Sequence, residues 1–237
     1  MFLDDFHTQA AGRIRISASQ ASRFAKRMAG DYNPIHDPDA RRFCVPGDLL
    51  FALVLAQHGL SQRMTFHFRG MVGDDVPLSI HICDDASLSV QDDAGKEVLF
   101  VERGGETTRD PTVIEALTRR YIAFSGRNFP HYLKPLMESR GVMFNPQRPL
   151  VIYDSMGFTL DSLDIAALAV EFVGSSFDIN GKRGEAHLQF RMTSQGEAVG
   201  SGSKKLVVSG LRDYDADVMD AFVNEFTRRK TCDETTD

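Results

Sequence analysis

The feature that most constrains the fold is an almost wholly apolar segment, Leu49–Leu60, which follows Pro46-Gly47 and precedes four strand-like runs. A helix that is apolar on nearly every face must be buried on all sides. The runs that follow it are separated by short turns rich in Asp and Gly, which is typical of an antiparallel sheet. They span residues 63–72, 76–83, 86–92 and 97–104. The pattern predicts an α+β fold in which an antiparallel sheet wraps one buried helix.

A shorter strand and helix precede this unit. Residues 12–17 alternate between polar and apolar side chains, which predicts a strand. Ser19 can cap a helix that carries Phe24 and Met28 on its apolar face. We expect Gly30 to end that helix, because glycine readily takes the left-handed conformation found at helix ends.

The second half of the chain repeats this plan. A predicted helix at Val113–Phe124 is followed by a bend at Ser125–His131, and Pro149 then opens the segment Leu150–Leu163. Pro46 and Leu60 align with Pro149 and Leu163, which predicts an internal duplication of roughly 100 residues. The alternative is that two unrelated α+β halves share a coarse pattern. The further strand-like runs span residues 165–173, 185–192 and 198–208.

Residues 213–230 carry an apolar stripe at helical spacing and predict a last helix, packed on the second half. We therefore divide the chain into an N-terminal half (residues 1–110), a C-terminal half (111–212), and a helix with a tail (213–237).

Composition excludes several classes of function. The formal net charge of −6 and a pI near 5.6 argue against a surface for nucleic acid. Three cysteines without close spacing (Cys44, Cys83 and Cys232) predict neither a disulfide framework nor a zinc site. No apolar run approaches the ~20 residues of a membrane span, and the N-terminus does not resemble a signal peptide. We expect a cytoplasmic protein without a metal, a cofactor or a membrane partner.

The chemistry is concentrated in Gly30-Asp31-Tyr32-Asn33-Pro34-Ile35-His36. A carboxylate and an imidazole stand five positions apart on a segment that Gly30 and Pro34 must bend. Such a pair can hold one water molecule between them, which suits the addition of water to a carbon–carbon double bond or its removal. The alternative interpretation is structural, with Asp31 capping the turn and His36 bonded to a backbone carbonyl.

This segment resembles the Gly-Asp-x-Asn-Pro-Ile-His signature of the MaoC-like dehydratases, the hydratase-2 group that includes (R)-specific enoyl-CoA hydratases. The resemblance implies a hotdog fold, in which a sheet wraps a long central helix. It also implies that Asp31 takes a proton from water, while His36 positions that water and helps to deliver a proton to C2 of an enoyl thioester. The backbone N–H of Gly47 would hold the thioester oxygen. We also assign Asn33, Pro34 and Asp48 to the substrate site.

The helix start departs from the family pattern, because Pro46-Gly47-Asp48 stands where the family usually has His-Gly-Met. Asp48 would place a negative charge beside an enolate. Two alternatives therefore stay open: a non-catalytic protein that binds acyl thioesters, and an acyl-CoA thioesterase. The helix start is also similar to that of β-hydroxyacyl-ACP dehydratases, but their catalytic Glu is replaced by Ala52, so that mechanism is rejected.

Gly126-Arg127-Asn128-Phe129-Pro130-His131 is a partial second copy of the motif, with Arg127 in place of the aspartate. An arginine cannot act as a base, so we expect this half to be catalytically silent. The pairing resembles double-hotdog hydratases, in which one half keeps the site and the other shapes the acyl tunnel. Arg127 and His131 are interpreted as relics, with a phosphate contact to a CoA-like carrier as the alternative for Arg127.

The resemblance implies a substrate carried as an acyl-CoA or acyl carrier protein thioester, interconverted between 2-enoyl and 3-hydroxyacyl forms. A double hotdog already contains the two-half unit, so either a monomer or a homodimer is expected.

Overall fold

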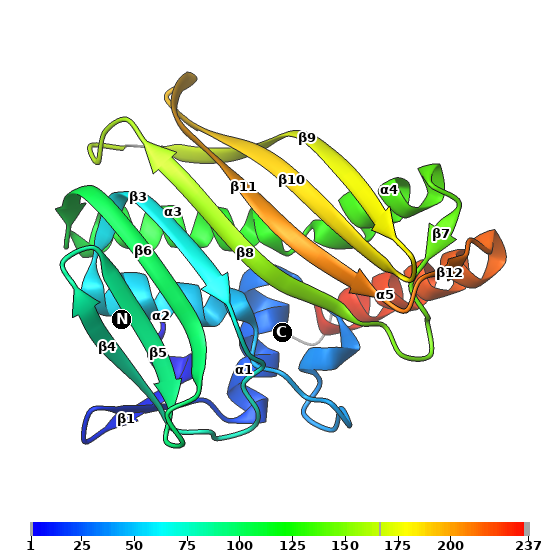
Figure 1. The fold of residues 1–237 in the computed structure, drawn as a ribbon, viewed down its shortest axis with the longest axis horizontal. Helices are drawn as coiled ribbons and strands as arrows, with labels where there is room; N and C mark the ends of the chain where they lie inside the picture. The colour runs from blue at the N-terminus through cyan, green and yellow to red at the C-terminus, as the bar shows by residue number, and fades with distance from the viewer. Residues whose placement is uncertain (1, 166, 235–237) are drawn as a thin grey trace.

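The computed structural model describes residues 2–165 and 167–234, with side chains as far as residue 231. Its main sheet is antiparallel and has ten strands in the order β1-β2-β4-β5-β6-β3-β8-β11-β10-β9 (Figure 1). A separate pair joins β12 to β7. The N-terminal strands are β1 (Thr8–Ala10), β2 (Arg13–Arg15), β3 (Leu60–Phe68), β4 (Leu78–Asp84), β5 (Ser87–Asp92) and β6 (Glu97–Thr108). The later strands are β7 (Val142–Met143), β8 (Val151–Leu160), β9 (Leu168–Asn180), β10 (Arg183–Ser194), β11 (Glu197–Ser209) and β12 (Arg212–Asp213).

Helices cover one face of this sheet (Figure 1). The α-helices are α1 (Ala18–Phe24), α2 (Gly47–His58), α3 (Pro111–Ser125), α4 (Leu133–Ser139) and α5 (Ala216–Glu234). Short helical turns add η1 (Asp4–Phe6), η2 (Ala25–Ala29), η3 (Pro34–His36) and η4 (Asn128–Tyr132). Helices α2 and α3 pack against each other beneath the strands (Figure 1). As predicted, α2 is buried along most of its length, from Leu49 to Leu55.

The fold is a double hotdog with an additional C-terminal helix, which confirms the predicted architecture. Strands β3 and β8 pair antiparallel at the centre of the sheet, from Arg63 opposite Thr159 to His67 opposite Ser155. Outward from this pair lie β6, β5 and β4 on one side and β11, β10 and β9 on the other. Each half therefore follows the same chain order from the centre to the edge. This repeat supports the internal duplication, which stays a prediction, as do the bounds of the halves.

The alignment of Leu150–Leu163 with the central helix is wrong. Residues 151–160 form strand β8, and Met156, Phe158 and Leu160 are its buried positions at period two. β-Branched residues at the start of the run also favour a strand. The short helix α4 instead occupies the place between the second motif copy and the first long strand of that half. A short apolar run does not by itself distinguish a buried helix from a strand, and sheet pairing decided the outcome.

The N-terminal helix begins two residues earlier than predicted. Ser17, not Ser19, is its cap: the Ser17 hydroxyl accepts from the backbone N–H of Gln20, and the Gln20 side chain accepts from the Ser17 N–H at 3.0 Å. This reciprocal pair satisfies two amides that would otherwise lack a partner. The helix then widens into the π-helical turn η2 and ends at Gly30, as expected.

Helix α5 packs by its apolar stripe on the second half, where Phe222 contacts the rings of Phe129 and Phe144. Its buried residues are Met219 and Phe226. No helix in the described part of the chain is both long enough and apolar enough to span a membrane. Cys44 and Cys83 are free thiols, and the Cys232 side chain lies outside the described residues.

Candidate functional site

The turn that carries Asp31 is fixed at its start by Gly30. Gly30 has φ of +62°, a left-handed conformation that favours glycine, and its N–H donates to Lys26 O at 3.1 Å. The Asp31 N–H donates to Ala25 O at 2.9 Å. The chain therefore leaves the helix sharply, and Asp31 stands directly after its last turn.

Asn33 fixes the next part of the turn. Its side-chain oxygen accepts from the backbone N–H of Ile35 at 3.2 Å, and Pro34 opens the short helix η3, as its fixed φ favours. The Asn33 N–H in turn donates to Asp31 Oδ1 at 2.9 Å. One carboxylate oxygen of Asp31 is thus held by the backbone, while Oδ2 stays available. Asn33 therefore bonds residues of the turn on both of its sides, Asp31 before it and Ile35 after it.

His36 is oriented by a bond on the far side of its ring. Its Nδ1 lies 2.7 Å from the carbonyl oxygen of Cys44, so Nδ1 carries the proton that this bond requires. The other nitrogen, Nε2, lies 3.8 Å from Asp31 Oδ2. That distance is too long for a direct hydrogen bond, and it suits one water bound to both groups.

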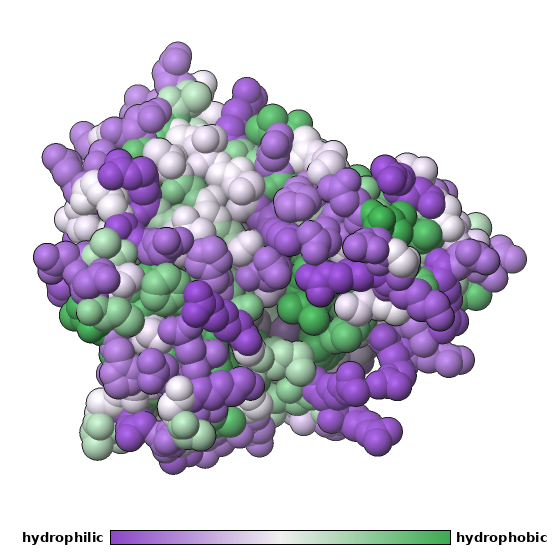
Figure 2. Space-filling view, viewed as in Figure 1, coloured by the Kyte–Doolittle hydropathy of each residue, from purple (hydrophilic) through white to green (hydrophobic). Residues whose placement is uncertain are grey.

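The pair borders a cavity of about 430 Å³, a volume that suits a small-molecule ligand. Of the six residues predicted from the sequence, five line it: Asp31, Asn33, His36, Gly47 and Asp48. Pro34 is not among the lining residues. In the described part of the chain, no group of three or more His, Cys, Asp or Glu side chains is placed to hold a metal ion. A space-filling view shows a hollow bordered by hydrophobic residues near the middle of one face (Figure 2).

Gly47 opens helix α2 at the edge of this cavity. The first amides of a helix have no acceptor within the helix, and they lie at the positive end of its dipole. The rings of Phe68 and Tyr153 pack closely over this glycine. A Cβ at position 47 would lie 2.9 Å from the Phe68 ring and 3.1 Å from the Tyr153 ring, so only glycine fits without displacing them.

Asp48, the next residue, is part of a buried polar cluster that joins the two halves. Its Oδ2 accepts from the Ser125 hydroxyl at 2.6 Å, and the Lys204 ammonium donates to the same hydroxyl oxygen. Burial raises the pKa of Asp48, an effect that the nearby Lys204 charge and the Ser125 bond oppose. Burial likewise lowers the pKa of Lys204, against the pull of Asp48. The positive charge of Lys204 thus partly offsets the negative charge of Asp48 beside the site.

Two tyrosines complete this cluster. The Lys204 ammonium lies 3.7 Å from the centroid of the Tyr153 ring, a cation–π contact, and the Tyr153 and Tyr121 hydroxyls are hydrogen-bonded. Burial raises the pKa of both phenols well above its usual value. Lys204 and Tyr153 line the cavity together with Asp48.

These second-half residues were missed by sequence reasoning, although a signal existed for Lys204. It lies in phase with Leu206 and Val208 along strand β11, so it faces the core with them.

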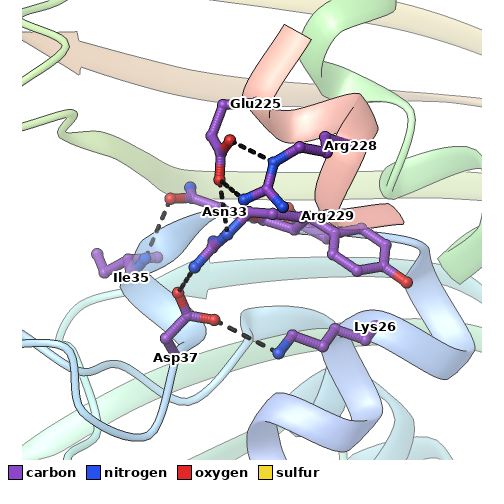
Figure 3. A network of polar contacts seen from close by, with 9 residues as sticks. Lys26, Asn33, Ile35, Asp37, Glu225, Arg228 and Arg229 are labelled. Carbon is purple, nitrogen blue, oxygen red and sulfur yellow. Dashed lines mark hydrogen bonds and ion pairs between the residues drawn. The ribbon is translucent and has the colours of Figure 1, made fainter. Parts of the chain in front are cut away.

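Helix α5 holds the motif turn from outside. Arg229 donates to Asp37 Oδ2 at 2.6 Å and to the carbonyl oxygen of Tyr32 at 3.3 Å (Figure 3). Lys26 lies 3.5 Å from the second oxygen of Asp37. One helix turn further back, Phe226 packs edge-on against the Tyr32 ring and lines the cavity. The C-terminal helix therefore contributes both a polar clamp and an apolar wall to the site.

The structure is similar to several solved structures at low sequence identity. It is similar to the TesB protein of Mycobacterium avium subsp. paratuberculosis, with 9% identity, a TM-score of 0.48, and 87% and 96% of the two chains covered. It is also similar to a MaoC-like dehydratase, with 11% identity, a TM-score of 0.44, and 86% and 98% of the two chains covered. A conserved protein of unknown function with a hotdog fold from Alicyclobacillus acidocaldarius matches with 10% identity, a TM-score of 0.44, and coverages of 88% and 98%. None of the curated proteins matches the chain.

A family model, by contrast, matches almost the whole chain, over residues 1–217. The match includes the motif turn, the start of helix α2 and strand β11, and it ends at the beginning of helix α5. The chain belongs to the DUF3581 family, whose description is a protein of unknown function.

Proposed function

We propose that this protein is a hydro-lyase that interconverts 2-enoyl and 3-hydroxyacyl thioesters, of the MaoC-like type that its motif resembles. The observation that carries the proposal is the pairing of Asp31 Oδ2 and His36 Nε2, 3.8 Å apart at the wall of one cavity. The other polar atom of each side chain is bonded to the backbone: Asp31 Oδ1 accepts from the Asn33 N–H, and His36 Nδ1 bonds the carbonyl oxygen of Cys44. Asp31 Oδ2 and His36 Nε2 therefore stay available.

In the hydration direction, a water held between the two side chains attacks C3 of the enoyl thioester. Its proton passes to the Asp31 carboxylate as the new C–O bond forms and the double bond opens. The electron pair moves to the thioester oxygen as an enolate. When the enolate collapses, C2 takes a proton from Nε2 of protonated His36. Asp31 then returns a proton to His36, and the site is restored.

The enolate oxygen needs a donor, and the backbone N–H of Gly47 is the group we assign. A helix N-terminus favours negative charge, so the start of α2 supports this role. Asp48 would oppose it as an isolated carboxylate. The buried Lys204 and the Ser125 bond both favour the charged form of Asp48 and partly offset its negative charge, which supports the assignment.

Hydration of crotonyl-CoA and of longer 2-enoyl-CoAs tests this function. We expect turnover by the wild-type protein and a loss of roughly 10²–10⁴-fold in kcat for Asp31→Asn and His36→Gln, the usual contribution of a positioned acid or base. Coenzyme A binding measured in parallel shows that the variants remain folded. Turnover that is equal in the wild type and in both variants would contradict the proposal.

A second candidate is a protein that binds acyl thioesters without turnover. It is favoured by the two aromatic rings that pack over Gly47, since they limit the approach of a substrate oxygen. A bound acyl ligand detected by mass spectrometry, without hydration at any chain length, would support it. The thioesterase alternative is separated by thiol release, because hydration leaves the thioester bond intact.

A further inference from the structure

A second cavity lies directly beside the proposed site. It has a volume of about 1030 Å³ and is formed by η2 with the end of α1, by the turn from α3 into η4, and by helix α5. We call it the basic groove. The positively chargeable side chains that line it are Arg23, Lys26, Arg27, Arg127, His131 and Lys230. No Asp or Glu is among its lining residues in the described part of the chain.

The charge of the groove is opposite to that of the whole chain, which has a net charge of −6. Three separate segments deliver the cations to one concave surface. Lys26 is partly compensated by Asp37, but that carboxylate is shared with Arg229 and lies outside the groove lining. Arg127, His131 and Lys230 have exposed side chains around the groove. Such a convergence of positive charge attracts a ligand with several negative groups.

The groove and the cavity share a wall made of Ala29, Gly126, Phe129 and Phe226, each of which lines both. Contact at this wall is close, because a Cβ at Gly126 would overlap the carbonyl oxygen of Ala29, at 1.6 Å. Along the motif turn, Gly30 lines the groove and Asp31 lines the cavity. The proposed reaction centre therefore lies where the two spaces meet.

We infer that the basic groove binds the phosphate-bearing nucleotide arm of coenzyme A, with the acyl group in the cavity. This inference rests on the proposed function, because it assigns the carrier of the same thioester. Coenzyme A has a diphosphate and a ribose phosphate, which match several arginine and lysine donors around a concave space. Phe129 and Phe226, which line both spaces, provide an apolar surface between the groove and the cavity. An acyl carrier protein presents an acidic helix and a single phosphate, and it would need a projecting basic surface.

In this geometry Arg127, which replaces the aspartate of the second motif copy, is a phosphate ligand. The second half then contributes to binding by the same segment that lost the catalytic pair.

Isothermal titration with free coenzyme A tests the inference without turnover. We expect Arg127→Glu to weaken binding by about tenfold or more, and Arg127→Lys to keep most of the affinity. Arg120→Glu is the matched control: Arg120 lies on helix α3, seven positions before Arg127, is exposed, lines neither cavity, and its substitution changes the net charge equally. The affinity of Arg120→Glu for coenzyme A is expected to stay within about twofold of the wild type, because salt screens the effect of a distant surface charge on the ligand. Coenzyme A that lacks the ribose phosphate is expected to bind more weakly than the complete molecule.

Wild-type affinity in both Arg127→Glu and Lys230→Glu would overturn the inference. So would a loss of affinity confined to Arg42→Glu, since Arg42 lines the cavity but not the groove. Hydration of an acyl carrier protein thioester without measurable coenzyme A binding would do the same. Asp31→Asn separates the two proposals, because it is expected to stop hydration and to leave coenzyme A binding unchanged.

Discussion

Replacing Lys204 by methionine should be among the most destabilising single changes in this fold. Lys204 is 2% exposed; its ammonium donates to Ser125 and lies over the Tyr153 ring. Methionine keeps the length and apolar volume of the side chain but leaves the Asp48 carboxylate buried without a cation. Lys204 and Asp48 are opposite buried charges that both bond the Ser125 hydroxyl, and leaving one such charge uncompensated costs about 3–5 kcal/mol. The unfolding temperature of a protein of this size falls by about 2–4 °C per kcal/mol, so we expect a decrease of roughly 6–20 °C.

Urea unfolding followed by circular dichroism measures the loss in the free energy of unfolding. Two further variants test whether that loss comes from the buried charge. Lys205→Met changes the adjacent lysine, whose partly exposed ion pairs with Asp154 and Glu185 are worth at most about 1 kcal/mol. The double variant Lys204→Met/Asp48→Asn removes both buried charges and should be more stable than Lys204→Met alone. A loss for Lys204→Met no larger than that for Lys205→Met would contradict the role of Lys204, as would a double variant that is no more stable than Lys204→Met.

Three other outcomes follow from the site. Gly47→Ala brings a methyl group 2.9 Å from the Phe68 ring, so overpacking should cost about 1–3 kcal/mol in a thermal melt and reduce turnover; wild-type values for both would contradict the packing. Arg229→Gln breaks the bond to Asp37 and should lower kcat while it changes the melting temperature little. Steady-state kinetics and a thermal melt measure the two effects separately. Burial raises the pKa of Asp48, so the free energy of unfolding of the wild type decreases as the pH rises above about 3.9, the ordinary pKa of an aspartate. The stability of Asp48→Asn relative to the wild type should therefore increase with this rise in pH, and a difference that does not change with pH would contradict this.

Much of the turn that carries Asp31 and His36 could be predicted because its geometry is local. Gly30, Asn33 and Pro34 each dictate the conformation of one or two neighbouring bonds, and the structure has all three in those conformations. The buried helix α2 was equally predictable, since no polar face on it could meet water. These features depend on residues only a few positions apart, so a local sequence pattern is enough to predict them.

The remaining features depend on contacts between distant segments. Asp37 and Arg229 are separated by 192 positions, and nothing in either segment specifies the other as a partner. Lys204 is followed directly by Lys205, and two adjacent lysines are typical of a solvent-exposed surface. Only the alternation of buried and exposed side chains along strand β11 shows that Lys204 faces the core. Residues 151–160 were assigned to the wrong element because an apolar run satisfies both a buried helix and a strand, and pairing with β3 and β11 selects the strand.

We propose that Asp31 and His36 hold one water and add it to C3 of an enoyl thioester. Incubation of crotonyl-CoA in ¹⁸O-labelled water, followed by mass spectrometry of the thioester, tests it most directly. With the wild-type protein we expect a 3-hydroxyacyl thioester that carries one labelled oxygen, and with Asp31→Asn we expect almost none. An unchanged enoyl thioester with the wild-type protein, at every chain length tried, would contradict it, as would equal labelling by the variant.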